Sequence, residues 1–247
     1  MTPRFASRAA ALLIGDELLK GRVVEANLHG LAQTLNALGV ELGRVVMVGD
    51  HVETIARDMA SLSTEFDLVV TSGGVGPTHD DVTLEAVALA FATEIVEDPS
   101  TVQLLIKAYG RPLSPAHLRL ARVPKGAQLA TTADVEWPAI VFGNVWLFPG
   151  VPEIFRMKLD VLRAWVRGPG ASHSRAVFTR VEEAALTPLL DRVVTRHREV
   201  AVGSYPKWFN ESYKTKVTFD ARDPAAVEVA LEEFLAGLPE GAVVHLE

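Results

Sequence analysis

Cysteine is absent from the 247-residue chain. This absence excludes disulfide bonds, thiolate metal sites and cysteine nucleophiles. A long apolar run is also missing near the N-terminus, where the apolar stretch stops at Gly15-Asp16-Glu17, too short to span a bilayer, and shows no clear leader-cleavage site. We therefore expect a cytoplasmic protein with no membrane partner.

Basic residues are fewer than acidic ones. The chain has 24 Lys and Arg against 31 Asp and Glu, which gives a net charge of -7. Because phosphate backbones need basic patches, this balance argues against a nucleic-acid partner, although a small anionic ligand fits it. The composition, 49% hydrophobic and 22% charged, is typical of a folded protein with a sizeable core.

Apolar runs alternate with amphipathic segments in the first part of the chain. The pattern predicts strands at 9–14, 45–48 and 68–71, and it predicts helices at 25–38, 52–62 and 84–91. This alternation indicates an α/β fold, a mostly parallel sheet with helices on both faces. Ligands bind beyond the carboxyl ends of such strands, so the three strand exits should converge on one edge.

Gly168-Pro169-Gly170 is the clearest linker in the sequence, and it divides the chain into predicted domains at 1–168 and 171–247. Beyond the linker the pattern predicts six elements in the order βαββαβ, which is that of a smaller, ferredoxin-like α+β domain. The expected elements are a strand at 175–181, a helix at 188–196, strands at 200–204 and 213–219, a helix at 224–235 and a strand at 242–246.

A glycine-rich turn follows the strand at 68–71. From Thr71 to Thr83 it reads Thr-Ser-Gly-Gly-Val-Gly-Pro-Thr-His-Asp-Asp-Val-Thr. Backbone N–H groups at a helix start hold phosphate without a basic side chain, and glycines let the backbone approach it closely. Asp80 and Asp81 add negative charge beside that anion, which a divalent cation such as Mg²⁺ would offset by bridging carboxylates and phosphate oxygens. The turn therefore predicts a metal-assisted nucleotide or phosphate-ester site.

Structural explanations stand beside this hypothesis. Thr78 and Asp81 are spaced as a helix-capping pair, and the helix dipole alone favours acids in a first turn. A tight turn accounts for the three glycines as well as a close ligand does. The segment matches neither the dinucleotide fingerprint nor the P-loop, since it lacks GxGxxG and no Lys follows the glycines.

Other strand exits supply polar groups that should reach the same ligand. Asp16, Glu17 and Asp50 follow the first two strands, although an Asp after a strand is also a common turn former. Lys20 would neutralise phosphate charge unless it is simply solvated. The segment 149–152, Pro-Gly-Val-Pro, suits either a helix start or a backbone wall against a flat ligand.

Four segments carry a family resemblance: 14–21 with Asn27, 48–50, 71–83 and 148–152. Together they resemble the molybdopterin-binding-like domain of competence/damage-inducible proteins, of eukaryotic FAD synthase and, more distantly, of molybdenum cofactor biosynthesis proteins. Residues 202–206 extend the resemblance into the second domain. It implies a three-layer αβα core whose glycine turn holds a phosphate or diphosphate.

The resemblance also implies a chemistry. Competence-type members resemble divalent-metal-dependent pyrophosphatases that act on ADP-ribose-like nucleotides, and the FAD synthase domain is similar to an FAD-hydrolysing unit. The molybdenum relatives adenylylate molybdopterin instead. All three attack a phosphorus under metal control. Relatives associate through the core domain, so we expect a homo-oligomer.

The resulting hypothesis is a nucleotide diphosphatase in which Asp50, Asp80 and Asp81 hold Mg²⁺ or a similar ion and Lys20 offsets charge in the transition state. The amides of 73–76 cradle the diphosphate. The expected nucleotide- or phosphate-binding residues are Gly15, Asp16, Glu17, Asn27, Ser72, Gly73, Gly74, Val75, Gly76, Thr78, Thr83, Pro149, Gly150, Val151 and Pro152. The alternatives are a molybdopterin adenylyltransferase-like enzyme and a non-catalytic protein that binds nucleotide or pterin, with molybdopterin as a ligand.

Overall fold

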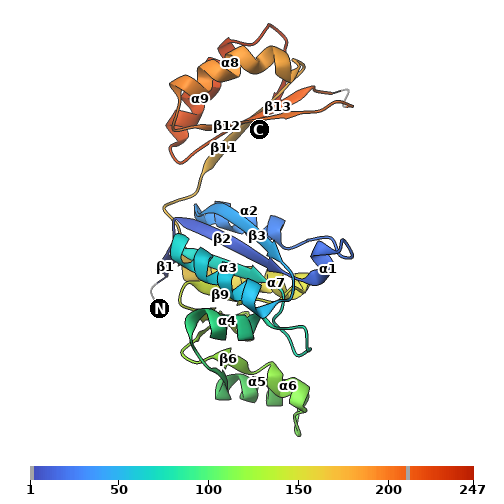
Figure 1. Cartoon of the computed structure of the whole chain (residues 1–247). Helices are drawn as coiled ribbons and strands as arrows, with labels where there is room; N and C mark the ends of the chain where they lie inside the picture. The colour runs from blue at the N-terminus through green and yellow to red at the C-terminus, as the bar shows by residue number, and fades with distance from the viewer. Residues whose placement is uncertain (1–2, 210–211) are drawn as a thin grey trace. The chain divides into compact units, whose positions relative to one another are not determined.

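The computed structural model describes residues 3–209 and 212–247. The chain divides into two compact units, Met1–Gly170 and Ala171–Glu247. Each unit buries hydrophobic side chains of its own. Figure 1 shows the path of the chain through them.

The first unit is built on a six-stranded sheet. Its strands are β3 (Glu41–Val48), β2 (Arg8–Ile14), β4 (Leu68–Ser72), β9 (Val145–Phe148), β8 (Ala139–Phe142) and β7 (Gln128–Ala130), in that order across the sheet. The first four are mutually parallel, and β8 and β7 are antiparallel to their neighbours. The sheet is therefore mostly parallel, with an antiparallel edge.

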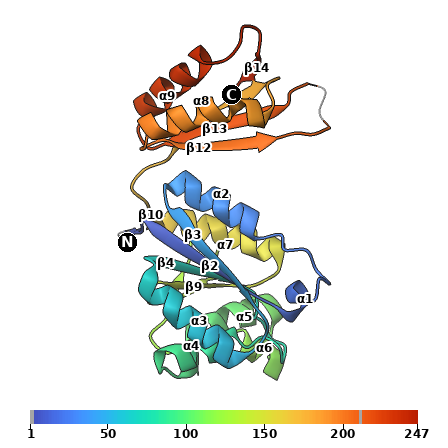
Figure 2. The same cartoon turned by 45° about the horizontal axis from the view of Figure 1, so that its top comes forward.

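Helices cover both faces of this sheet, which makes three layers. On β2, Ala9, Ala11 and Leu13 pack toward α2 (Leu28–Leu38) and α7 (Pro152–Trp165). The alternate residues of β2 pack toward α3 (Val52–Glu65) and α4 (Thr83–Phe91) on the other face. Figure 2 shows α2 and α7 on one side of the sheet and α3 on the other. The αβα prediction is confirmed, and burial on both faces explains why β2 is apolar throughout.

Several further elements, most of them short, complete the first unit. α1 (Asp16–Leu19) follows β2 directly, and β1 (Arg4–Phe5) pairs with β10 (Val166–Arg167). After α4 the chain forms β5 (Ile95–Glu97), α5 (Pro99–Tyr109), α6 (Pro115–Arg119) and β6 (Arg122–Pro124), with β5 antiparallel to β6. In Figure 1 this green segment lies beyond α4, on the side away from α2.

The second helix begins later than its hydrophobic pattern predicts, at Leu28 rather than at residue 25. The Glu25 carboxylate accepts hydrogen bonds from the backbone amides of Asn27 and Leu28, at 2.7 and 3.0 Å. Glu25 thus satisfies N–H groups at the helix start from outside the helix, because these donors have no intrahelical partner.

The second unit contains β11 (His173–Thr179), α8 (Glu183–Arg196), β12 (Ala201–Pro206), β13 (Thr215–Ala221), α9 (Pro224–Ala236) and β14 (Val243–Leu246). Its sheet has the order β12-β13-β11-β14, and all neighbouring strands are antiparallel. This is the ferredoxin-like arrangement that the βαββαβ order predicts.

The start of α8 corrects the predicted helix at 188–196. The helix begins five residues earlier, at Glu183, and contains Pro188 inside it. A proline near the helix start removes a single backbone hydrogen bond. Leu186, Leu189 and Val193 are buried on the core side of α8, which offsets that loss.

In the part of the chain that the structure describes, every helix is too short or too polar to cross a bilayer.

Candidate functional site

The carboxyl ends of three parallel strands meet at one edge of the large sheet, as the alternation predicts. After β2, the Gly15 amide donates to the Val48 carbonyl of β3 at 3.0 Å. The Asp16 amide donates to the Asp50 carboxylate at 2.8 Å. The exits of β2 and β3 are thus tied together, and β4 delivers the glycine turn beside them.

The backbone of the turn requires its first two glycines. Gly73 has φ of 108° and Gly74 has φ of 64°, a region that favours glycine. A Cβ on Gly73 would overlap the Ile14 carbonyl oxygen, and one on Gly74 would overlap the Thr83 hydroxyl. The tight approach of the turn to β2 and α4 therefore explains these two glycines without a ligand.

Three consecutive amides in the turn remain available to a ligand. The Gly73 amide is not among them, because it donates to the Phe148 carbonyl of β9 at 3.1 Å, which corrects its predicted place in the cradle. Within residues 3–209 and 212–247, the amides of Gly74, Val75 and Gly76 have no hydrogen-bond acceptor. Successive unpaired N–H groups of this kind form an anion-binding concavity.

Asn27 holds the loops around the turn together. Its side-chain amide donates to the Ser72 hydroxyl at 2.9 Å and to the Gly150 carbonyl at 2.8 Å. Asn27 is 6% exposed; its bond to Ser72 is buried and its bond to Gly150 is partly buried. The Thr83 hydroxyl, also buried, donates to the Gly73 carbonyl at 2.9 Å. Asn27, Ser72 and Thr83 therefore position the loops rather than lining the cavity.

An open cleft of about 490 Å³ lies over the turn. Thirteen predicted site residues line it: Gly15, Glu17, Asp50, Gly73, Gly74, Val75, Gly76, Thr78, Asp80, Asp81, Pro149, Gly150 and Val151. Six predicted residues do not line it: Asp16, Lys20, Asn27, Ser72, Thr83 and Pro152. Three residues that sequence reasoning missed complete the lining: Pro77, Leu120 and Ile154. Pro152 instead starts α7.

The side-chain charges that line this cleft are all negative. They come from Glu17, Asp50, Asp80 and Asp81, and neither Lys nor Arg is among the lining residues. Hydrogen bonds from the Thr78 hydroxyl and from the Asp80 backbone amide hold the pKa of the Asp80 carboxyl below its usual range. Asp80 is therefore ionised at neutral pH. Phosphate beside these carboxylates would need a bound cation.

Thr78 and Asp81 do interact, but not as a helix cap. The Thr78 amide donates to the Asp81 carboxylate at 2.8 Å, and its hydroxyl donates to the same oxygen. α4 begins only at Thr83, with Val82 at the N-cap and no side-chain cap. The pair closes a turn inside the loop, which shapes the rim of the cleft.

Lys20 lies outside the cleft, and its ammonium is already paired. Its Nζ is 2.5 Å from the Asp16 carboxylate, and both side chains are substantially exposed. The hydrogen bond from Lys20 is the main reason that the pKa of Asp16 lies below its usual value. In this arrangement Lys20 neutralises Asp16.

Metal binding has no preformed cage in the structure. Among the described residues, no three His, Cys, Asp or Glu side chains are gathered closely enough to hold a metal ion. Asp50 and Asp80 both line the cleft, however. Mg²⁺ commonly uses one or two carboxylates together with phosphates of the substrate, so the lining fits an ion that arrives with its ligand.

Sequence reasoning missed a second set of residues, around Lys158 on α7. Lys158 is 2% exposed, and its ammonium donates to the carbonyls of Trp137 and Pro138, the latter at 2.9 Å. Phe155, Leu159 and Leu162 are buried on the same helix. Lys158 follows Phe155 by three residues and precedes Leu162 by four, which places it on the buried face of the helix. A lysine at such a position is the signal that would have identified it.

Comparison with known proteins agrees with the motifs. Residues 10–167 match the family model described as "Probable molybdopterin binding domain", and residues 171–247 match "FAD synthase, middle domain". The chain belongs to the molybdopterin-binding domain family. The resemblance that the motifs predict is thereby confirmed.

Individual members of this family are similar to the chain over different lengths. A probable FAD synthase of Caenorhabditis briggsae is 32% identical over 267 residues, covering 96% of the chain and 51% of the relative. The chain thus spans about half of that relative's length. A CinA-like protein of Myxococcus xanthus is 38% identical over 160 residues, covering 62% of the chain and 38% of the relative.

A solved structure supports the fold of the first unit. The crystal structure of CinA from Thermoplasma acidophilum aligns with a TM-score of 0.59 and 29% identity. The alignment covers 64% of this chain and 97% of that one.

Proposed function

We propose that this protein is a metal-dependent diphosphatase that hydrolyses the diphosphate of a nucleotide such as FAD or ADP-ribose. The observation that carries the proposal is the row of three unpaired amides, Gly74 to Gly76, in a cleft whose charged lining side chains are all acidic. Amides attract an anion, and acids attract a cation. A diphosphate with a divalent ion satisfies both.

The roles of the lining residues follow from their positions. The amides of Gly74, Val75 and Gly76 donate to phosphate oxygens, and they stabilise the charge that develops there in the transition state. Asp50 and Asp80 hold the ion, with Asp81 fixed by Thr78 at the rim. Bound in this way, a divalent ion would polarise the phosphoryl oxygen and lower the pKa of water.

The reaction adds water across the diphosphate. A water oxygen bonds to one phosphorus, the bridging P–O bond breaks, and the other phosphate leaves with the bridging oxygen, which takes up a proton. FAD would give AMP and FMN, and ADP-ribose would give AMP and ribose phosphate. Glu17 lines the cleft and is the residue we assign to orient the water, because Asp16 is engaged by Lys20.

The names of the relatives support a nucleotide-related enzyme. Both units of the chain align with proteins named probable FAD synthase, and the second unit matches the middle domain of FAD synthase. FAD is accordingly the first substrate to test, followed by ADP-ribose and other dinucleotides.

The direct test is a hydrolysis screen with Mg²⁺, Mn²⁺ and Co²⁺, with release of AMP measured by chromatography. Asp80→Ala should lower kcat about a hundredfold or more, because it removes an ion-holding carboxylate. Asp160→Ala, an exposed acid of α7 that pairs with Arg163, is the matched control and should retain activity. Equal rates for Asp80→Ala and the parent protein would refute the assignment.

A second candidate is favoured by the family description, which names molybdopterin. In that case the same cleft would hold ATP and a pterin, and the protein would transfer AMP to molybdopterin. Thin-layer analysis of ATP with molybdopterin would reveal the product. Nucleotide binding without turnover in either assay would instead identify a non-catalytic binding protein.

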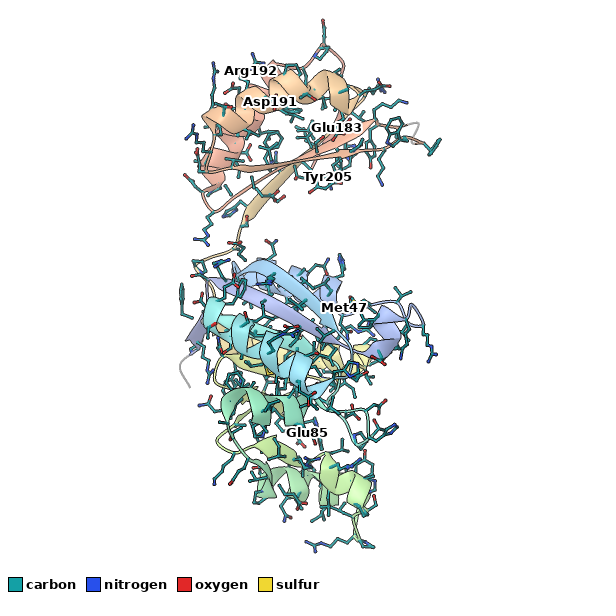
Figure 3. The ribbon with its side chains drawn as sticks, viewed as in Figure 1. Met47, Glu85, Glu183, Asp191, Arg192 and Tyr205 are labelled. Atoms are coloured by element: carbon teal, nitrogen blue, oxygen red, sulfur yellow. The ribbon has the colours of Figure 1, made fainter. Side chains whose placement is uncertain are left out.

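We also propose a homo-oligomer, formed at the open edge of the large sheet. The edge strand β3 exposes Val45 and Met47, which are 42% and 39% exposed; Figure 3 labels Met47. An unpaired edge with exposed apolar side chains favours pairing with another chain. Sedimentation of the parent and of Met47→Lys tests this, since a dimer through β3 should dissociate in the variant.

A further inference from the structure

A second cavity, of about 310 Å³, adjoins the cleft. The two cavities share five lining residues: Val75, Gly76, Leu120, Pro149 and Ile154. Two of the unpaired amides therefore stand at the junction. A ligand whose phosphate binds those amides has a path into the second cavity, which we call the side pocket.

The walls of the side pocket are largely apolar and come from separate elements. Leu84 lies on α4, Ile140 on β8 and Leu147 on β9. Two aromatic side chains, Tyr109 at the end of α5 and Trp137 before β8, complete this lining. Apolar walls with aromatic rings suit a flat ring system, because stacking and burial of apolar area both stabilise it.

Three basic side chains also line the side pocket, and two of them are engaged within the protein. Arg122 pairs with Glu85 of α4 at 2.8 Å, and Figure 3 labels Glu85. Arg119 donates to the Pro77 carbonyl at 3.2 Å. The third, Lys158, is buried and has no carboxylate within ion-pair distance in residues 3–209 and 212–247.

Two of the three ammonium hydrogens of Lys158 are used in hydrogen bonds within the protein. An ammonium carries three hydrogens, and the carbonyls of Trp137 and Pro138 accept two of them. Burial costs the charged form free energy and lowers the pKa of Lys158 to about 8, so the group is still mainly protonated at pH 7. Among residues 3–209 and 212–247 the third hydrogen of this buried cation has no acceptor, so the group is suited to an acceptor on a ligand.

We propose that the side pocket binds the flavin ring of FAD, with Trp137 against its face and Lys158 donating to a ring carbonyl oxygen. The ring has an apolar dimethylbenzene edge for the apolar walls and a carbonyl-bearing edge for Lys158. Adenine has no carbonyl oxygen, and a phosphate would lose its hydration against Leu84, Ile140 and Leu147. The inference rests on the proposed function in placing the diphosphate at the glycine turn.

FMN is the probe, because it carries the ring but has no diphosphate to hydrolyse. Its fluorescence should be quenched on binding, since Trp137 contacts the ring. Lys158→Met should raise the Kd for FMN about tenfold or more by removing a charged hydrogen bond. Its affinity for ADP-ribose, measured by calorimetry with Ca²⁺ in place of Mg²⁺ to slow hydrolysis, should stay within about twofold of the parent value.

Two further variants keep the test decisive. Lys125→Met, an exposed lysine paired with Glu94, is the matched control and should bind FMN as the parent does. Trp137→Leu should abolish most of the quenching even if Lys158→Met fails to fold, which thermal unfolding would show.

The inference is overturned if Lys158→Met binds FMN as tightly as the parent, or if it weakens FMN and ADP-ribose equally. It is also overturned if neopterin binds and FMN does not. Failure of the proposed function looks different: the parent would hydrolyse neither FAD nor ADP-ribose, whereas the FMN titrations would still report on the side pocket.

Discussion

The cleft and the side pocket lie at the same end of the large sheet and have opposite chemical characters. Four acids and no basic residue line the cleft, whereas three basic residues and no acid line the side pocket. The residues common to both are uncharged. Separation of charge in this way allows one ligand to place a metal-bound phosphate in one cavity and a ring that bears carbonyl oxygens in the other.

The two cavities also differ in how the chain builds them. Loops that follow parallel strands form most of the cleft, and their backbone supplies the donors. The side pocket is formed mostly by side chains from α4, α5, α6, β6, β8, β9 and α7. Backbone changes should therefore damage the cleft, and side-chain changes should alter the side pocket.

The largest expected effect comes from Gly73→Ala, which tests the role of the cleft backbone. The added Cβ would overlap the Ile14 carbonyl and impose strain at φ of 108°, so we expect a loss of about 3 kcal/mol in the free energy of unfolding. Gly143→Ala is the matched control, because it too has positive φ but open space around it. Chemical denaturation measures both, and equal losses would contradict a steric role for Gly73.

An intermediate effect is expected from Asn27→Ala, which breaks the link between Ser72 and Gly150. Loss of one buried and one partly buried hydrogen bond should destabilise the protein by about 2 kcal/mol. Diphosphate hydrolysis should fall more than FMN binding, since Asn27 supports the cleft and not the side pocket. Asn36→Ala, at an exposed position of α2, serves as the control. If Asn27→Ala lowered the affinity for FMN as much as it lowered the rate of hydrolysis, the cavities would not be separable in this way.

The smallest effect concerns pH and the side pocket. Because the pKa of Lys158 is lowered to about 8 in the folded protein, the unfolded chain binds its proton more tightly. Between pH 8 and 10 the unfolded state holds more protons, so the Lys158 contribution to stability should rise, by on the order of 1 kcal/mol. Denaturation of the parent and Lys158→Met at pH 7, 8, 9 and 10 measures the difference. Parallel pH profiles for the two proteins would contradict the burial of a charged lysine.

Much of the fold could be predicted because it depends on local pattern. β2 is buried on both faces and is therefore apolar at every position from Ala9 to Ile14. Parallel strands with intervening helices place their exits together, so Asp16 and Asp50 could be expected near one another from sequence alone. The motifs around the glycine turn then predicted the family.

Features that depend on tertiary contacts could not be predicted. The Gly73 amide donates to the Phe148 carbonyl and is therefore not available to a ligand. That bond could be predicted only if the position of β9 beside β4 were known. The position of Lys158 on the buried face of α7 can be read from the sequence, but its two acceptors lie 20 and 21 residues upstream, just before β8, and no periodic pattern signals that contact. The short strands β5 and β6 pair only with each other, and neither has the length that makes a strand recognisable.

Gly150 and Gly73 meet at the floor of the cleft, where a Cβ on Gly150 would lie 3.3 Å from the Gly73 Cα. A side chain on Gly150 would press on the Gly73 backbone, and one on Gly73 would overlap the Ile14 carbonyl oxygen, so both positions favour glycine. A change of ligand preference in this scaffold would then come from substitutions at the rim of the cleft and in the side pocket, while the two glycines of the floor stay unchanged.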